Sequence, residues 1–294
     1  MFALLLAGAH AGGTASPAPP KPPTVDFGTL DPRADVQPKN QDGTDHPVRA
    51  RLIAEHTRVA PGSTVRVGLH LTQQHGWHTY WTSPGEIGLP TGITWSLPEG
   101  WSAGPYTYPA PQRFEAEELV SFGYDDQVLL FADVTVPADA APGALDLAAS
   151  AEWLVCNTSC IPGRAELTLP LEVGPVAAPA PWSGLFDHYA AQHPARPEDV
   201  GLTAELLLSQ DAVLPYAPFK AALKLSGPAR IEPDTGRFAF APIVGDGWMI
   251  SGTKVGHLDD ALVVQIEGET LLDAPPESDR IGGLFQVIVD GKPV

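Results

Sequence analysis

The stretch that decides the fold class covers residues 165–173 and reads Ala165-Glu166-Leu167-Thr168-Leu169-Pro170-Leu171-Glu172-Val173. From residue 167 onward, every second side chain is a leucine or valine, and the positions between them are threonine, proline or glutamate. Successive side chains of a strand point to opposite sides of a sheet, so a period of two residues is typical of a strand with one buried face. The stretch therefore predicts a half-buried β-strand.

Runs of the same kind occur on both sides of this stretch. In one of them, Val65, Val67, Leu69 and Leu71 alternate with polar or small residues. The 29 glycines and 32 prolines of the chain argue against long helices and favour strands joined by turns. Short strands at this spacing predict antiparallel β-sandwiches. We expect the other strands at residues 77–81, 92–97, 128–136, 145–155, 202–209, 221–225, 237–241, 248–255, 261–267 and 283–290.

Composition divides the 294 residues into segments with different expected roles. The N-terminus has a short apolar run followed by Ala9-His10-Ala11, which is typical of a signal-peptide cleavage site, although the usual basic start is missing. The next segment is rich in proline and is expected to be a disordered tether. A run of glycine, proline and alanine later in the chain predicts a linker, and a short helix over 182–192 follows it. The predicted order is a signal peptide at 1–11, a tether at 12–46, a β-sandwich at 47–174, a linker at 175–182 and a second β-sandwich at 183–294.

The charge of the chain excludes some classes of partner. With 17 Lys and Arg against 35 Asp and Glu, the formal net charge is −18. Such a surface repels phosphate backbones and anionic headgroups, so we expect neither nucleic acid nor bare membrane as a partner. The sequence also lacks an apolar run of about 18 residues, which a membrane-spanning helix requires. We expect a periplasmic or otherwise exported protein that is not inserted in the membrane after processing.

Only two cysteines are present, Cys156 and Cys160, and they follow an apolar run and open a turn. Three intervening residues allow the sulfurs to meet if the strand ends there. A disulfide that closes so small a loop adds roughly 2 kcal/mol of stability in the chain-entropy model. Bonds of this kind at a strand end are exposed to exchange. The pair therefore favours a redox function, while a structural disulfide and a metal site remain alternatives.

A metal site at the cysteines would need further ligands. His75 and His78 are candidates, and two thiolates alone would suit Cu(I). Nothing in the sequence brings the histidines to Cys156 and Cys160, however, and we expect no cofactor and no metal. A cysteine protease is a weaker hypothesis, because the second cysteine would trap the nucleophile as a disulfide.

Four motifs together resemble the N-terminal periplasmic region of DsbD-type thiol:disulfide interchange proteins, and above all the ScsB-like branch, which is associated with copper tolerance. The resemblance is specific over 48–173 and weaker over 182–294. The motifs are Gly76-Trp77-His78-Thr79-Tyr80-Trp81, Pro84-Gly85-Glu86-Ile87-Gly88-Leu89-Pro90-Thr91, Phe122-Gly123-Tyr124 and Trp153-Leu154-Val155-Cys156-Asn157-Thr158-Ser159-Cys160-Ile161-Pro162.

This resemblance implies an immunoglobulin-like sandwich in which Cys156 and Cys160 are the exchanging pair. It further implies that Phe122 belongs to a segment that caps the disulfide, and that Tyr80 and Trp81 line the site; packing in the core is the alternative for these three. Full-length family members continue into membrane and thioredoxin-like domains, and we expect neither to be part of this protein. We therefore expect the reductant to be a separate membrane thiol protein and the partners to be thioredoxin-fold proteins outside the cytoplasm.

A hypothesis of a different class is a non-catalytic binding or scaffold protein. It would have two immunoglobulin-like domains and an inert disulfide between Cys156 and Cys160. A role as a component of a protein-disulfide oxidoreductase and a role in Cu(I) handling are the other possibilities that the sequence leaves open.

Overall fold

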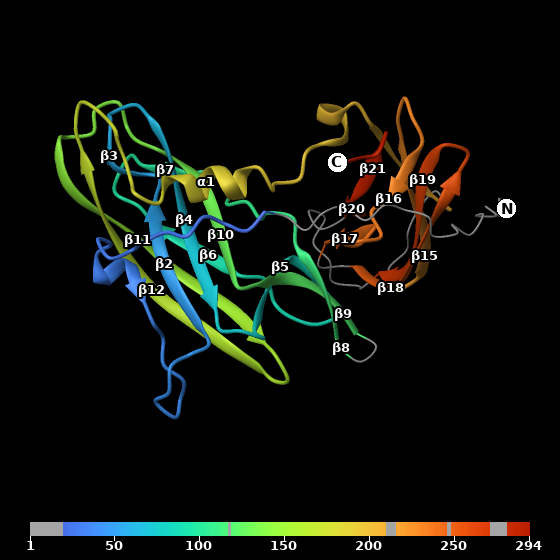
Figure 1. Ribbon diagram of the computed structural model, residues 1–294, viewed down its shortest axis with the longest axis horizontal. Coiled ribbons are helices and arrows are strands. Elements are labelled where there is room, and N and C mark those ends of the chain that lie inside the picture. Colours follow the sequence, from blue (N-terminus) through green and yellow to red (C-terminus); the bar gives the residue numbers. More distant parts are fainter. Residues whose placement is uncertain (1–19, 117–118, 210–215, 246–247, 271–280) are drawn as a thin grey trace. The chain divides into compact units, whose positions relative to one another are not determined.

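The computed structural model describes residues 20–116, 119–209, 216–245, 248–270 and 281–294. The expected signal peptide at 1–11 and the start of the expected tether, 12–19, lie outside the described residues. The described chain forms two compact units, residues 20–193 and 194–294. Both are built almost entirely of antiparallel sheets, which confirms the predicted mostly-β fold class (Figure 1).

Two sheets make up the first unit. The smaller sheet has the strand order β1 (Asp35–Val36), β2 (Val48–Ala54), β4 (Thr64–Gln73), β10 (Gln127–Thr135) and β7 (Ser102–Ala103). The larger sheet has the order β13 (Ala178–Pro179), β3 (His56–Val59), β12 (Cys160–Val173), β11 (Gly143–Cys156), β5 (His78–Gly85), β9 (Leu119–Asp125) and β8 (Gln112–Ala116), and β6 (Gly92–Ser96) also pairs with β11.

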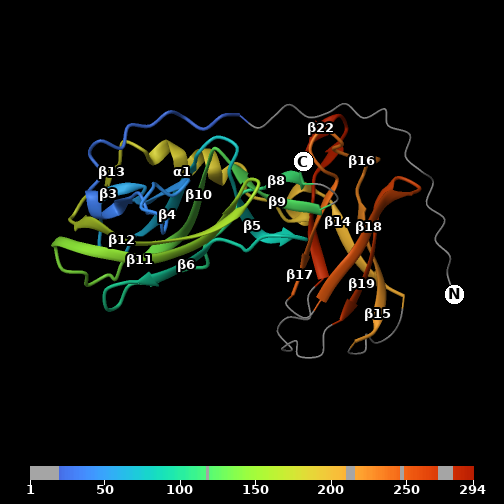
Figure 2. The ribbon, with the colours of Figure 1, turned by 90° about the horizontal axis from the view of Figure 1, so that it is seen from below.

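The core of the first unit lies between these two sheets. Figure 2 shows β4 and β10 in one layer and the long strands β11 and β12 in the other. Leu69 pairs with Leu130 across β4 and β10, and both are fully buried. On β12 the apolar positions from 165 to 173 are buried and the positions between them are not, as the period of two predicts. Burying one such leucine stabilises the fold by roughly 1.5–3 kcal/mol.

The described part of the expected tether is ordered against the first unit. Phe27 packs against His70 at 5.2 Å and Trp182 at 5.7 Å between ring centroids, and the Arg51 guanidinium lies 4.7 Å from its ring centre. The short 3-10 helix η1 (Pro32–Ala34) then leads into β1. The prediction of disorder up to residue 46 was wrong for this part, because an aromatic anchor, the pairing of β1 with β2 and the ion pair of Arg33 with Asp146 hold a segment whose average composition is that of a linker.

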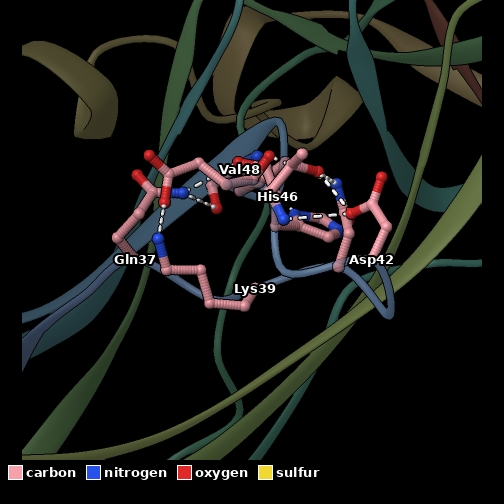
Figure 3. A network of polar contacts seen from close by, with 8 residues as sticks. Gln37, Lys39, Asp42, His46 and Val48 are labelled. Atoms are coloured by element: carbon pink, nitrogen blue, oxygen red, sulfur yellow. Dashed lines mark hydrogen bonds and ion pairs between the residues drawn. The ribbon is translucent and has the colours of Figure 1, made fainter.

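The loop from Gln37 to Val48 is closed by its own polar contacts (Figure 3). The Gln37 side-chain amide donates to the His46 carbonyl at 2.8 Å, and the Val48 backbone N–H donates to His46 Nδ1 at 3.1 Å. Lys39 and Asp45 form an ion pair at the surface. These contacts hold the buried His46 ring in place.

The boundary between the units lies after His193, later than the predicted linker at 175–182. Within that linker, β13 pairs with β3, and the Trp182 indole N–H donates to the Ala54 carbonyl at 2.8 Å. The helix α1 (Ser183–Ala190) belongs to the first unit, since its buried Phe186 packs against Phe131 of β10 at 5.6 Å. The expected helix is therefore present, but it packs on the first sandwich.

The second unit contains three small sheets. The first has the order β14 (Thr203–Leu208), β15 (Pro218–Ser226), β19 (Ala261–Thr270) and β18 (Trp248–Leu258), and the 3-10 helix η2 (Pro197–Val200) comes before β14 in the chain. The second has the order β16 (Ile231–Pro233), β21 (Val287–Val289) and β22 (Lys292–Pro293). The third pairs β17 (Phe240–Val244) with β20 (Ile281–Phe285). Two clusters of buried apolar residues lie among them, one around Phe219 and Phe240 and one around Ile231 and Leu262. Among the described residues, no helix has the length and apolar character that crossing a membrane requires.

Candidate functional site

Cys156 and Cys160 are joined by a disulfide at the end of the β11–β12 hairpin. Cys156 is the last residue of β11, Cys160 is the first residue of β12, and the two are the closing pair of the ladder. The loop between them has three residues, in which the Asn157 N–H donates to the Ser159 carbonyl at 3.0 Å. The expected bond therefore forms because two long antiparallel strands place both Cα atoms in register, 4.1 Å apart.

The disulfide lies on the outer face of its sheet. Along β11 the odd-numbered side chains from Leu147 to Val155 are buried in the core, whereas Ser150 and Glu152 on the other face are not. Cys156 belongs to this outer face, yet only 3% of its surface is exposed. Cys160 is on the same face and is exposed. The two sulfurs thus differ in their access to another protein.

Aromatic side chains of β5 and β8 gather on the face of the sheet to which the buried cysteine belongs. His78 of β5 lies directly opposite Cys156 in the sheet, so the two side chains point to the same face. The Phe114 ring of β8 stacks on the His78 ring with 4.3 Å between centroids and 11° between planes. Tyr80, two residues along β5, meets His78 edge to face at 5.2 Å. These three residues form what we call the aromatic cover of the site.

The other two aromatic residues that the sequence placed at the site lie on the opposite side of the sheet. Trp81 and Phe122 are both buried and meet edge to face at 6.5 Å between ring centroids. Phe122 pairs with Arg113 on β8, whereas Phe114, the next residue of β8, pairs with Ser121. Because a shift of one residue moves a side chain to the other face, Phe122 and Trp81 contribute to the core, and Phe114 occupies the position on the disulfide side.

Close packing beneath the hairpin fixes its end. Gly163 lies over the Trp153 indole, and a Cβ atom there would be 2.2 Å from the indole nitrogen. His46 meets the edge of the same indole at 5.8 Å. Only glycine permits this approach, so the segment Trp153–Gly163 is specified by packing as well as by its cysteines.

The described surroundings of the pair offer little positive charge. Arg164, the cation nearest in sequence, is already paired with Glu166 at 2.7 Å and Glu152 at 3.4 Å. Burial lowers the pKa of His78, with Asp125 opposing this effect, and burial raises the pKa of Tyr80. A thiolate at this position would therefore have little help from positive charge.

Metal binding finds no additional support in the geometry. Across the part of the chain that the structure describes, no three His, Cys, Asp or Glu side chains come together as a potential metal site. His75 is exposed in the turn before β5.

Sequence reasoning missed two members of the aromatic cover. His78 was considered only as a possible metal ligand, and no strand was predicted over 112–116. The alternation of Arg113, Phe114 and Glu115 could have indicated an edge strand with one apolar side chain on one face. The contact with His78 depends on strand register, which the sequence does not reveal.

Comparison with known proteins agrees with this geometry. Residues 49–172 match the family model described as the N-terminal part of the thiol:disulfide interchange protein DsbD. The crystal structure of the N-terminal periplasmic domain of ScsB from Proteus mirabilis is similar to this chain with a TM-score of 0.58 and 20% identity, covering 88% of this chain and 95% of that chain. This similarity shows a shared fold.

A second structure, of a protein of unknown function from Porphyromonas gingivalis W83, has 14% identity and covers 84% of this chain and 94% of that chain. Its TM-score of 0.23 is too low to indicate a shared fold. No curated protein sequence matches the chain.

The family match spans the strands that carry the disulfide and also β5, β8 and β9. Residues 49–172 therefore form a DsbD-type N-terminal domain, a domain related to thiol:disulfide exchange.

Proposed function

We propose that this protein passes electrons through the Cys156–Cys160 pair to thioredoxin-fold partners in an exported compartment, cycling between disulfide and dithiol. The observation that carries the proposal is the unequal access to the two sulfurs, with Cys156 buried and Cys160 exposed on the outer face of a sheet. An exchanging pair needs one thiol that meets the partner and a second that resolves the mixed disulfide. Cys160 suits the first role and Cys156 the second.

The resemblance to the family supports thioredoxin-fold partners, and we propose transfer of electrons from this protein to them. Domains of this family interact with thioredoxin-fold proteins in general. In the proposed cycle, a separate membrane thiol protein reduces the pair, and the exposed Cys160 thiolate then attacks the disulfide of a thioredoxin-fold protein. The Cys156 thiolate attacks Cys160 in turn, the protein disulfide re-forms, and the partner leaves with both of its thiols reduced.

Single-cysteine variants test this division of roles. Cys156→Ser leaves the exposed Cys160 without its resolving partner, so the mixed disulfide with an oxidised thioredoxin should persist and be visible as a band on a non-reducing gel. Cys160→Ser leaves only the buried thiol and should capture far less. Equal capture by both variants, or capture by neither, would contradict the proposed exchange.

The reduction potential distinguishes the proposal from the scaffold hypothesis. Equilibration of the wild-type protein with glutathione buffers should give a value within the range of exchange proteins, from about −120 to about −270 mV. A value below about −300 mV is typical of inert structural disulfides and would favour a scaffold.

A further inference from the structure

We propose that His78 is the general base that takes the proton from the Cys156 thiol as this cysteine resolves the mixed disulfide. This inference rests on the proposed exchange function and assigns a role to a residue that the cysteine chemistry alone does not use. The geometry of three strands carries it.

The first observation is the position of His78. It lies directly opposite Cys156 between β5 and β11, and this is the single register pair that joins these two strands. Side chains of directly opposed residues point to the same face and have Cβ atoms about 4.5–5.5 Å apart, which places an imidazole within reach of a thiol. The pairing of β5 with β11 therefore makes the His78 imidazole and the Cys156 sulfur neighbours.

The second observation is the burial of Cys156, which calls for a neighbouring base to remove the thiol proton. A thiol becomes nucleophilic only as a thiolate, and the exposed Cys160 can lose its proton to water. Cys156 is 3% exposed, so bulk water has little access to its proton. Burial also disfavours a standing charge on the sulfur, which makes proton removal during the attack the more favourable route.

The third observation is the state of the His78 ring. Stacking against Phe114 and edge contact with Tyr80 fix its orientation. Its Nε2 atom is buried and has no hydrogen-bond partner among the described residues. Burial is the largest effect on the pKa of His78 and lowers it, so the ring is neutral near pH 7 and able to accept a proton.

Among the described residues of the neighbouring strands, the charged group opposite the ring is Asp125. Asp125 lies opposite His78 on β9 and is exposed, and it raises the pKa of the ring in opposition to burial. From β8 and β5, the neighbouring side chains are the uncharged Phe114 and Tyr80. An imidazolium formed at His78 can thus pass its proton toward solvent on the Asp125 side.

In the proposed step, Cys156 resolves the mixed disulfide between Cys160 and the partner. After attack by Cys160, the mixed disulfide joins its sulfur to the partner. His78 takes the proton of the Cys156 thiol, the resulting thiolate attacks the Cys160 sulfur, and the bond between Cys160 and the partner breaks. The partner sulfur leaves as a thiolate that is protonated by solvent. The pair has lost two electrons, the partner has gained two, and His78 returns its proton to solvent.

A single-turnover experiment on the full reduced chain separates the two attacks. The probe is dithiobis(nitrobenzoic acid), used below one equivalent, because each attack releases one coloured thiolate. The first release reports the attack by Cys160, and the second reports the attack by Cys156. We expect His78→Gln to leave the first release unchanged and to slow the second at least about tenfold at pH 7, at the lower end of general-base effects.

The pH profile gives a readout that a structural role would not move. In the wild type, the second release should already be level at about pH 6.5, the ordinary pKa of histidine, because burial holds the pKa of His78 below that value and the base is then neutral. In His78→Gln it should continue to rise, by about tenfold per pH unit, until the thiol itself ionises near pH 8.5. A wild-type second release that rises through this whole range would overturn the proposal without any variant.

Two further variants complete the test. His78→Phe keeps a ring for stacking on Phe114 but has no base, so it should resemble His78→Gln. His75→Gln, three residues upstream in an exposed turn, is the matched control and should resemble the wild type. Equal slowing of both releases would show a structural role and refute the inference. Failure of the wild type to give a second release would instead refute the proposed exchange function.

Discussion

Reducing the Cys156–Cys160 disulfide should weaken the first unit only slightly. The two cysteines are four positions apart in sequence, so the bond closes a loop of five residues. For a loop of this size, the chain-entropy model gives a stabilisation of about 2 kcal/mol. With a urea m-value of about 2 kcal/mol per molar, the unfolding midpoint should fall by about 1 M on reduction. For a two-electron couple, about 2 kcal/mol corresponds to roughly 40 mV, so folding shifts the potential of the pair only modestly.

The assay is urea-dependent hydrogen exchange followed by mass spectrometry, which reads peptides from β11 and β12 separately from those of the second unit. The oxidised chain, the chain reduced with dithiothreitol and the Cys156→Ala, Cys160→Ala double variant should all show protected β11 and β12 in the absence of urea. A loss of about 4 kcal/mol or more on reduction, at the upper end for disulfides, would refute the reasoning. The bond would then be a structural requirement of the hairpin, and a folded dithiol state could not serve as a carrier.

The remaining predictions concern packing, access and pH. Gly163→Ala places a Cβ against the Trp153 indole and should lower the free energy of unfolding by about 1–3 kcal/mol, whereas Gly92→Ala, where an added Cβ meets nothing within 4 Å, should change it little in the same urea titration. Phe114→Ala opens the aromatic cover and should speed reduction of the disulfide by dithiothreitol; an unchanged rate would show that the cover does not limit access. Burial lowers the pKa of His70 to about 4, whereas the same side chain in the unfolded chain has a pKa of about 6.5. Between these pH values the unfolded chain binds more protons than the folded chain. The free energy of unfolding should therefore be constant above pH 6.5 and fall by about 3 kcal/mol towards pH 4. His70→Gln should flatten this dependence in urea titrations at several pH values.

Much of the fold could be predicted because strand periodicity is a local property. The alternation in 165–173 and the turn at the cysteines are sufficient to predict the strand and the disulfide, and both are present. The packing of Phe27 on Trp182 could not be predicted, since these residues are far apart in sequence and only the folded sheet brings them together. An interpretation based on composition alone therefore predicted a disordered tether where residues 20–46 are ordered.

The disulfide could be predicted from the sequence, but its surroundings could not. Cys156 and Cys160 are close in sequence, so their meeting needs only a turn. The aromatic cover needs the register of three strands, and a slip of one residue exchanges Phe114 for a neighbour on the other face. The resemblance to a family indicated an aromatic cap, and the Phe122 position proved to be in the core.

The unequal exposure of the two sulfurs follows from the topology of the sheet. Cys156 ends a strand with neighbours on both sides, since it pairs with Cys160 on β12 and with His78 on β5. At Cys160 the situation differs, because the other neighbour of β12 in the described chain, β3, pairs only at Glu172 and Val173, at the far end of the strand. Cys160 thus lies at a sheet edge, where another protein can approach, and Cys156 lies inside the sheet, beside a potential base. Sheet position alone therefore gives two chemically identical residues different access, and this difference is the basis of the roles that we propose for them in exchange.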